Sequence, residues 1–119
     1  EEVAYRQFPR LKERRSQISG TLSGGEQQML AMARGLAVNP AVLLLDELSM
    51  GLAPLIVEEL YGLVVNIARA GTSILVVEQF ARTVLGVADI AAIMVNGSIR
   101  RVGTPAEVEH ELSAAYLGG

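Results

Sequence analysis

Apolar positions along this chain switch between helical spacing and short unbroken runs. From Glu26, apolar residues recur every three or four positions until Asn39-Pro40 supplies a stop, which predicts a helix. Ser23, three residues before Glu26, completes a capping-box arrangement at the start of that helix. A second stripe, beginning at Pro54 and ending before Gly71, predicts another helix. The apolar positions of the two stripes are Met29, Leu30, Ala33, Leu36 and Ala37, followed by Ile56, Leu60, Leu63 and Ile67.

Three segments contain short apolar runs of the length of buried strands: residues 41–47 (AVLLLDE) and 72–79 (TSILVVEQ), which both end in polar residues, and 90–95 (IAAIMV). A short helix is expected over 80–88, and Asn96-Gly97 predicts a type I′ hairpin into a further strand. Because strands alternate with helices, we expect an α/β fold with a mostly parallel sheet. Strands that are apolar throughout are typical of a sheet covered on both faces.

The first fifteen residues are highly charged, with Phe8 and Leu11 as apolar anchors and Pro9 interrupting any single helix. We interpret this region as a pair of surface helices and not as a basic membrane-binding patch, because its glutamates offset its arginines. A boundary is expected near Asn39-Pro40, where this all-helical segment gives way to the predicted sheet.

Composition narrows the class of protein. The chain has 119 residues, of which 50% are hydrophobic and only 4% aromatic, so its core is expected to consist of Leu, Val, Ile, Ala and Met. A net charge of −3 gives no support for nucleic-acid binding, and the absence of cysteine excludes disulfides and thiolate metal sites. No apolar run reaches the roughly 18 to 20 residues of a membrane span. The sequence opens in mid-pattern without Met, and we expect it to be a piece of a longer protein.

Polar residues that end two of the predicted strands are the first candidates for chemistry. Asp46-Glu47 and Glu78-Gln79 are expected at the carboxyl edge of the sheet, where α/β proteins usually bind ligands. Adjacent residues of an extended strand point to opposite faces, so Asp46 and Glu47 are expected to have different roles. One carboxylate would hold Mg²⁺ through water, and the other would orient and deprotonate an attacking water. The alternative is a pair of solvated acids at a strand end.

Gly24 and Gly25 stand directly before the first predicted helix. Glycine at a helix start lets an anion approach the free backbone N–H groups, but a flexible lead-in to a capped helix explains the pair equally well. The chain has no G-x-x-x-x-G-K-[ST] loop, which is the usual phosphate-binding loop of nucleotide-hydrolysing proteins.

The C-terminal part offers fewer candidates. Thr104 and Glu107 form a second capping box, which predicts a final helix. His110, the only histidine, lies in this charged helix and is predicted to be a surface residue. Arg100 and Arg101 close a hairpin strand and are predicted to be exposed to solvent.

Together these motifs resemble a known family. Residues 22–54, LSGGEQQMLAMARGLAVNPAVLLLDELSMGLAP, are similar to the signature motif, signature helix, Walker B strand and D-loop of ATP-binding-cassette (ABC) ATPases, in order and spacing. The resemblance covers essentially all 119 residues and implies a P-loop NTPase (RecA-like) fold. Residues 1–40 would be the end of the helical signature subdomain, and 41–119 the C-terminal part of the RecA-like core. The lysine loop and the glutamine loop of the family are absent from this chain.

The resemblance implies a role for each matching residue. Ser23, Gly24, Gly25 and Glu26 would act in trans on the ATP of a partner subunit. Asp46 would hold Mg²⁺ through water, Glu47 would be the catalytic base, and Gln79 would sense the γ-phosphate. The D-loop would comprise Ser49, Met50, Gly51, Leu52 and Ala53.

Three departures from the family pattern stand out. Gln79 replaces the histidine of many relatives, and it cannot titrate near neutral pH. Leu48 replaces a usual Pro and is expected to loosen the turn after Glu47. Ala53 replaces an Asp, which would remove one polar contact between subunits.

Finer similarities point to one kind of transporter. GLAP, LVVEQFA and FPRLKERR are similar to the second of the two ATP-binding subunits of branched-chain amino acid importers. The resemblance implies an ATPase in the full-length subunit, with ATP and Mg²⁺ as ligands. It implies a second ABC ATPase subunit bound head to tail as a homo- or heterodimer, transmembrane permease subunits, and indirectly a periplasmic binding protein, but no nucleic acid. The location implied is the cytoplasmic face of the inner (plasma) membrane, as a peripheral protein.

Three alternatives stay open. The same machine could import urea or short-chain amides, whose ATPases are closely similar. The chain as it stands could be an inactive, non-catalytic dimerisation module, because it lacks the lysine loop. It could also belong to an ABC protein without a transport role.

Overall fold

The computed structural model describes residues 2–16 and 23–117. Its residues divide into two compact units, Glu1–Gln79 and Phe80–Gly119. Leu22, the first residue of the predicted signature motif, lies outside the described residues. Within the described ranges no helix is long and apolar enough to cross a membrane.

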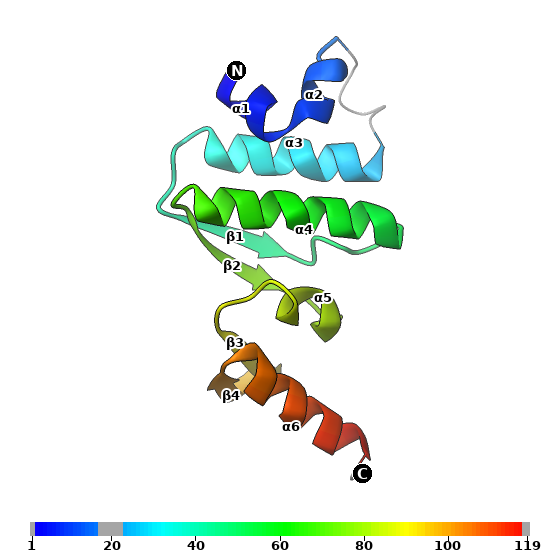
Figure 1. Cartoon of the computed structure of the whole chain (residues 1–119), viewed down its shortest axis with the longest axis vertical. Helices are drawn as coiled ribbons and strands as arrows, with labels where there is room; N and C mark the ends of the chain where they lie inside the picture. Colours follow the sequence, from blue (N-terminus) through cyan, green and yellow to red (C-terminus); the bar gives the residue numbers. More distant parts are fainter. Residues whose placement is uncertain (1, 17–22, 118–119) are drawn as a thin grey trace. The chain divides into compact units, whose positions relative to one another are not determined.

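The first unit opens with two short helices, α1 (Glu2–Gln7) and α2 (Pro9–Glu13). Phe8 lies between them and is completely buried, and Leu11 is buried as well. Since Pro9 occupies the first turn of α2, it starts a helix without disrupting one. The predicted pair of helices with two apolar anchors is therefore confirmed. Helix α2 contacts helix α3 (Gly24–Leu36), and α1 contacts helix α4 (Pro54–Arg69), so the pair lies over the two longer helices of this unit (Figure 1).

Two longer helices form the centre of this unit: α3 (Gly24–Leu36) and α4 (Pro54–Arg69). They lie side by side and begin at the same end (Figure 1). Gly71, with a φ of 113°, follows the last turn of α4, where a residue with a Cβ atom would be strained. The buried residues of the two helices include the predicted Met29, Leu60 and Ile67, together with Met32, Tyr61 and Val64, which the predicted stripes omitted.

The sheet of the first unit consists of strands β1 (Val42–Asp46) and β2 (Ser73–Val77), joined through α4. They are parallel, in a register that runs from Val42 opposite Ser73 to Asp46 opposite Val77. This βαβ arrangement is the parallel sheet that the alternation of strands and helices predicted.

Only one face of this two-stranded sheet is covered by the described residues. Leu43 and Leu45 are buried, whereas Leu44 is 69% exposed and Leu75, opposite it in the register, is 59% exposed. The prediction that both faces are covered is therefore wrong for this part of the chain. The strands are apolar on both faces, but α3 and α4 pack on one side only (Figure 1).

The second unit contains helix α5 (Ala81–Leu85), strands β3 (Ala91–Val95) and β4 (Ser98–Gly103), and helix α6 (Pro105–Leu117). β3 and β4 pair antiparallel, with an irregularity between Ile93 and Met94. Asn96 and Gly97 both have positive φ values, 48° and 80°, as the predicted type I′ turn requires. The third predicted strand thus pairs with its neighbour in sequence, because a two-residue turn joins only antiparallel strands.

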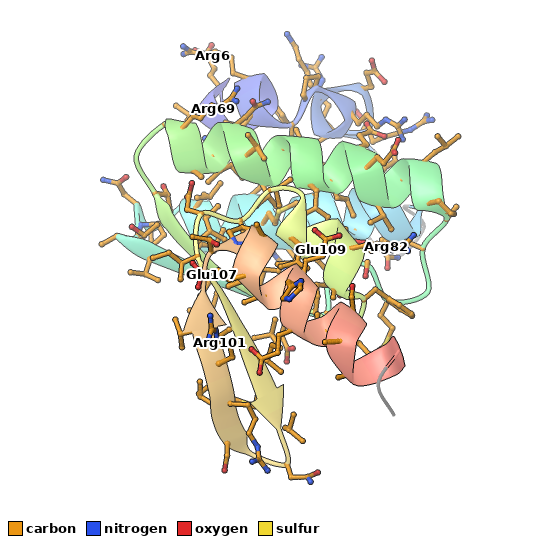
Figure 2. The ribbon with its side chains drawn as sticks, turned by 60° about the horizontal axis from the view of Figure 1, so that its bottom comes forward. Arg6, Arg69, Arg82, Arg101, Glu107 and Glu109 are labelled. Carbon is orange, nitrogen blue, oxygen red and sulfur yellow. The ribbon has the colours of Figure 1, made fainter. Side chains whose placement is uncertain are left out.

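Helix α6 is fastened to β4 by polar side chains. The Glu107 backbone N–H donates to Thr104 Oγ1 at 3.2 Å, as the second capping box predicted. Figure 2 shows Arg101 of β4 beside Glu107 at the start of α6, and its Nη2 lies 2.9 Å from Glu107 Oε2. His110 is exposed, which confirms its prediction as a surface residue.

The predicted boundary between residues 40 and 41 stays a prediction. In this structure the four helices α1–α4 and the strands β1 and β2 belong to one compact unit, and the division falls between Gln79 and Phe80.

Candidate functional site

The carboxyl ends of β1 and β2 and the N-termini of α3 and α4 lie at one end of the first unit (Figure 1). The predicted site residues of this unit belong to these segments, directly precede α3 or follow the two strands. Because Asp46 pairs with Val77 in the register, the segments that follow the two strands start next to each other. The predicted convergence of Asp46-Glu47 and Glu78-Gln79 at one sheet edge is therefore confirmed.

Ser23 starts α3 through a complete capping box. Its backbone is extended (φ −60°, ψ 161°), and its Oγ accepts the Glu26 backbone N–H at 3.2 Å. The Ser23 backbone N–H in turn donates to Glu26 Oε1 at 3.2 Å. Since a serine hydroxyl has two lone pairs and one hydrogen, Ser23 can cap the helix and still hydrogen-bond a ligand.

Gly24 and Gly25 are packed against the segment that follows β1. A Cβ atom placed on Gly24 would lie 2.8 Å from Leu52 Cδ2, and one on Gly25 would lie 2.5 Å from Ile56 Cγ2. Both distances are shorter than van der Waals contact, so the two glycines let the start of α3 approach the D-loop and α4. The sequence offered two explanations for glycine at these positions, the approach of an anion and a flexible lead-in to the helix. The structure adds a third, which is close packing.

Glu26 is a buried carboxylate at the first turn of α3. Burial acts to raise its pKa, but hydrogen bonds from Ser23 and the charge of Arg14 outweigh it, so the pKa lies below its ordinary value of 4.5. Arg14 Nε lies 3.4 Å from Glu26 Oε2 and links α3 to the residues after α2. The acidic residue of the signature segment thus acts within its own chain in this structure.

The lowered pKa of Glu26 predicts an acid-sensitive helix start. A carboxyl with a lower pKa in the folded state contributes stability that is fully present above 4.5 and is lost as the pH falls through the folded value. We expect the loss to be on the order of 1 kcal/mol, the usual size of a helix cap. Urea unfolding at about pH 7 and about pH 3 would measure it. Glu26→Gln should flatten this dependence, and an unchanged slope in that variant would contradict the assignment.

Glu47 has an unusual backbone conformation directly after β1. Its φ is 50°, in the left-handed region, although its N–H still continues the sheet by donating to Val77 O at 2.8 Å. The other non-glycine residues with positive φ in the described ranges are Asn39 and Asn96, a residue type that tolerates it well. A glutamate held there is strained, and such strain clusters at functional sites. The extended geometry assumed for Glu47 is therefore wrong. Asp46 ends the extended strand and Glu47 starts the turn, so the two carboxylates differ in backbone conformation and in exposure.

The two carboxylates have the donor chemistry of a magnesium site. Asp46 is exposed and Glu47 is half-buried, and neither side chain bonds to another described residue. The described ranges contain no group of three or more His, Cys, Asp or Glu side chains that could by themselves hold a metal ion. Mg²⁺ usually takes one or two carboxylates, with waters and substrate phosphates completing its shell. The residues present fit an ion of that kind.

A cavity of about 260 Å³ lies between α3 and β1 and reaches Asp46. Its lining is mostly apolar and includes Met32, Leu43 and Leu48. Gln28 crosses from α3 and donates through Nε2 to Leu48 O at 3.3 Å, which ties the signature helix to the turn after Glu47. The expectation that Leu48 loosens this turn stays a prediction, although the Leu48 side chain is itself buried.

The predicted D-loop is a compact turn. The Met50 N–H donates to Glu47 O, and the Leu52 N–H donates to Ser49 O, each at 3.2 Å. Gly51 has a φ of 73°, which the turn requires, and Ala53 is extended before Pro54. The proposed contact of this loop with a partner subunit stays a prediction.

Glu78 is a site residue whose role the sequence did not reveal. Its carboxylate accepts hydrogen bonds from the Ser49 backbone N–H, the Ser49 hydroxyl and the Tyr61 hydroxyl. Burial, followed by the neighbouring Glu78 carboxylate, raises the pKa of Tyr61 well above its ordinary value. Gln79 is exposed directly after it. The sequence signal was only an acid at the end of an apolar strand.

Residues 2–49 match the family model described as ABC transporter. The chain is similar to the high-affinity branched-chain amino acid transport ATP-binding protein BraG of Pseudomonas aeruginosa, with 46% identity over 114 residues, 94% of this chain and 49% of that protein. It is also similar to the lipopolysaccharide export system ATP-binding protein LptB of Haemophilus influenzae, with 33% identity over 106 residues, 87% of this chain and 44% of that protein. The solved structure of MJ1267, an ATP-binding cassette of an ABC transporter, matches with a TM-score of 0.82 and 29% identity, over 94% of this chain and 46% of that chain.

The fold and these likenesses define the class of protein as an ATP-binding cassette of the P-loop NTPase type. The match of residues 2–49 to the ABC transporter model and the 46% identity to BraG agree with the resemblance to ABC ATPases that the signature, Walker B and D-loop segments predicted. The chain spans about half the length of the curated relatives that it matches.

Proposed function

We propose that this chain is part of an ATP-hydrolysing subunit that energises the import of branched-chain amino acids. The observation that carries the proposal is the junction of three segments: the capped start of α3, the turn at Glu47 and the D-loop. Gly24 and Gly25 place the helix start directly on Leu52 and Ile56. Below, the full-length subunit means the proposed polypeptide of the relatives' length that contains this chain.

The start of α3 is suited to meet a phosphate. Its first backbone N–H groups carry the positive end of the helix dipole, and α3 is 13 residues long. Among the described residues, Ser23 and Gly24 are both exposed at this helix start. We propose that Ser23, Gly24, Gly25 and Glu26 form the signature segment and that its helix start meets the ATP of a partner subunit, with Glu26 capping the helix from within its own chain.

Glu47 and Asp46 are proposed to act on the ATP of their own subunit. The Glu47 carboxylate would accept the proton of an attacking water, because it has no other bonding partner among the described residues. Asp46 would hold Mg²⁺ through water, and the ion would supply charge stabilisation at the phosphates. Gln79 would hydrogen-bond the γ-phosphate or the water but could not take up its proton.

The import of branched-chain amino acids is supported by the 46% identity to BraG. The similarity to LptB is lower, at 33%, and LptB serves lipopolysaccharide export, so the solute needs a direct test. The proposed partners are a second ATPase subunit bound head to tail, transmembrane permease subunits and, through them, a periplasmic binding protein. The proposed location is the cytoplasmic face of the inner membrane.

A transport assay tests this function. Cells that lack the full-length subunit should regain uptake of radiolabelled leucine when it is restored, and they should not regain it with the Glu47→Gln variant. Glu58→Gln, which changes an exposed carboxylate on α4, is the matched control and should restore uptake. If labelled urea is taken up and leucine is not, the amide-importer alternative replaces the proposal. If neither solute depends on the subunit, import itself is contradicted.

A further inference from the structure

Glu78 connects three segments of the first unit through one carboxylate. Oε1 accepts the Ser49 backbone N–H at 3.0 Å and the Tyr61 hydroxyl at 2.6 Å, and Oε2 accepts the Ser49 hydroxyl at 2.9 Å. Ser49 belongs to the turn after β1, Glu78 directly follows β2, and Tyr61 lies in the second turn of α4. These three residues are called the Glu78 clamp below.

Both residues that donate to Glu78 are buried. Ser49 is 9% exposed and Tyr61 is 3% exposed, so both donors are shielded from water. Hydrogen bonds to an ionised carboxylate are about twice as strong as neutral ones, and a low dielectric strengthens them further. The raised pKa of Tyr61 agrees with a phenol that stays protonated to donate to Glu78.

The clamp links the segment that carries Glu47 to the segment that carries Gln79, the two residues proposed to act at the γ-phosphate. Ser49 lies two residues after Glu47, and Glu78 lies immediately before Gln79. The Glu47 N–H is also bonded to Val77 O at 2.8 Å, so the two segments are linked by backbone as well as by side chains. Glu47 itself is held in a strained left-handed conformation, which persists only when its surroundings impose it.

We propose that Glu78 is a positioning residue that sets the distance between the Glu47 carboxylate and Gln79 and couples the D-loop to both. It does not touch the substrate. Tyr61 anchors the clamp to α4, and Ser49 carries its effect to the Glu47 turn. This inference rests on the proposed ATPase function, and it gives a specific role to a residue that the sequence placed only among the polar candidates at the sheet edge.

The chemical test compares Tyr61→Phe, Ser49→Ala and Glu78→Gln in the full-length subunit. Each removes one part of the clamp and leaves Glu47 and Gln79 unchanged. Since a displacement of about 1 Å costs on the order of a hundredfold in rate, we expect kcat to fall about ten- to a hundredfold. The KM for ATP should stay within about twofold, because the clamp makes no contact with the substrate. Tyr61→Phe and Ser49→Ala together should cost less than the sum of the two, because both act through Glu78.

A structural control separates positioning from lost stability. Val64→Ala truncates a buried side chain of α4 outside the clamp, and its unfolding free energy should fall by at least as much as that of Tyr61→Phe. At a temperature where all variants are folded, Val64→Ala should keep the parental kcat. Hydrogen exchange at the Ser49 amide should quicken in Tyr61→Phe and Glu78→Gln and stay slow in Val64→Ala.

The outcomes are distinct. If the parent hydrolyses ATP but the clamp variants keep its kcat and lose only stability, as Val64→Ala does, Glu78 has a structural role alone and the positioning inference is wrong. A rise in KM with an unchanged kcat also overturns it, since that would indicate contact with ATP. If the parent itself does not hydrolyse ATP, the proposed function fails, and the inference that rests on it is overturned with it.

Discussion

Glu47→Gln in the full-length subunit is expected to lower the ATP turnover rate by about a hundred- to ten thousandfold, the usual contribution of a general base. Glutamine keeps the shape of the side chain and can still hydrogen-bond a water, but it cannot accept its proton. Glu47 has the setting of a base, because its carboxylate is half-buried and bonds to no described residue. ATP should remain bound and unhydrolysed in the variant.

The measurement is steady-state phosphate release, together with the amount of ATP retained after gel filtration. Glu58→Gln is the matched control, since it removes an exposed carboxylate of α4 that has no proposed role in the reaction. It should turn over ATP at the parental rate. Parental turnover by Glu47→Gln would show that another residue is the base, and Glu47 would lose its proposed role.

Gly25→Ala is expected to destabilise the protein by about 1–3 kcal/mol, the range for overpacked core positions. Helix propensity alone predicts the opposite sign, because Ala in a helix is favoured over Gly by about 1 kcal/mol. The overlap decides the result, since the new Cβ atom would lie 2.5 Å from Ile56 Cγ2. Ile56 is β-branched and stiff at χ1, so it cannot turn away at low cost.

Gly62→Ala provides the matched control on α4. A Cβ atom there meets nothing within 4 Å, so only propensity acts, and the variant should gain about 0.5–1 kcal/mol. Urea unfolding without nucleotide measures both variants. Adding Ile56→Ala to Gly25→Ala should recover part of the loss, because it removes the overlapping methyl group. If Gly25→Ala stabilises as Gly62→Ala does, close packing does not explain this glycine.

Much of the fold follows from local rules. The helix starts at Ser23 and Thr104 have their predicted side-chain caps, and Pro54 occupies the first turn of α4. Asn96-Gly97 forms the predicted hairpin turn. These features depend on residues close together in sequence, so the short-range pattern is enough to predict them.

Predictions that depend on distant residues were less complete. The apolar character of Leu44 and Leu75 indicated two buried sheet faces, but the described residues cover only one of them. Helical periodicity identified Met29 and missed Met32, because which part of an amphipathic helix is most deeply buried depends on what packs against it.

By itself, the sequence indicated the resemblance to ABC ATPases, the order of the elements and the candidates Ser23, Asp46, Glu47 and Gln79, because these depend on residue types at fixed spacing. The tertiary structure alone decided how they are held: the left-handed turn at Glu47, the contact of Gly25 with Ile56, and the three donors on Glu78. The physical reason is that each of these depends on atoms brought together by packing; Ser49 and Glu78, for example, are 29 positions apart in the sequence. Gly24 and Gly25, the first residues of α3, illustrate both contributions. Their place in the sequence identifies the signature motif, and their lack of side chains lets α3 pack on the D-loop and α4.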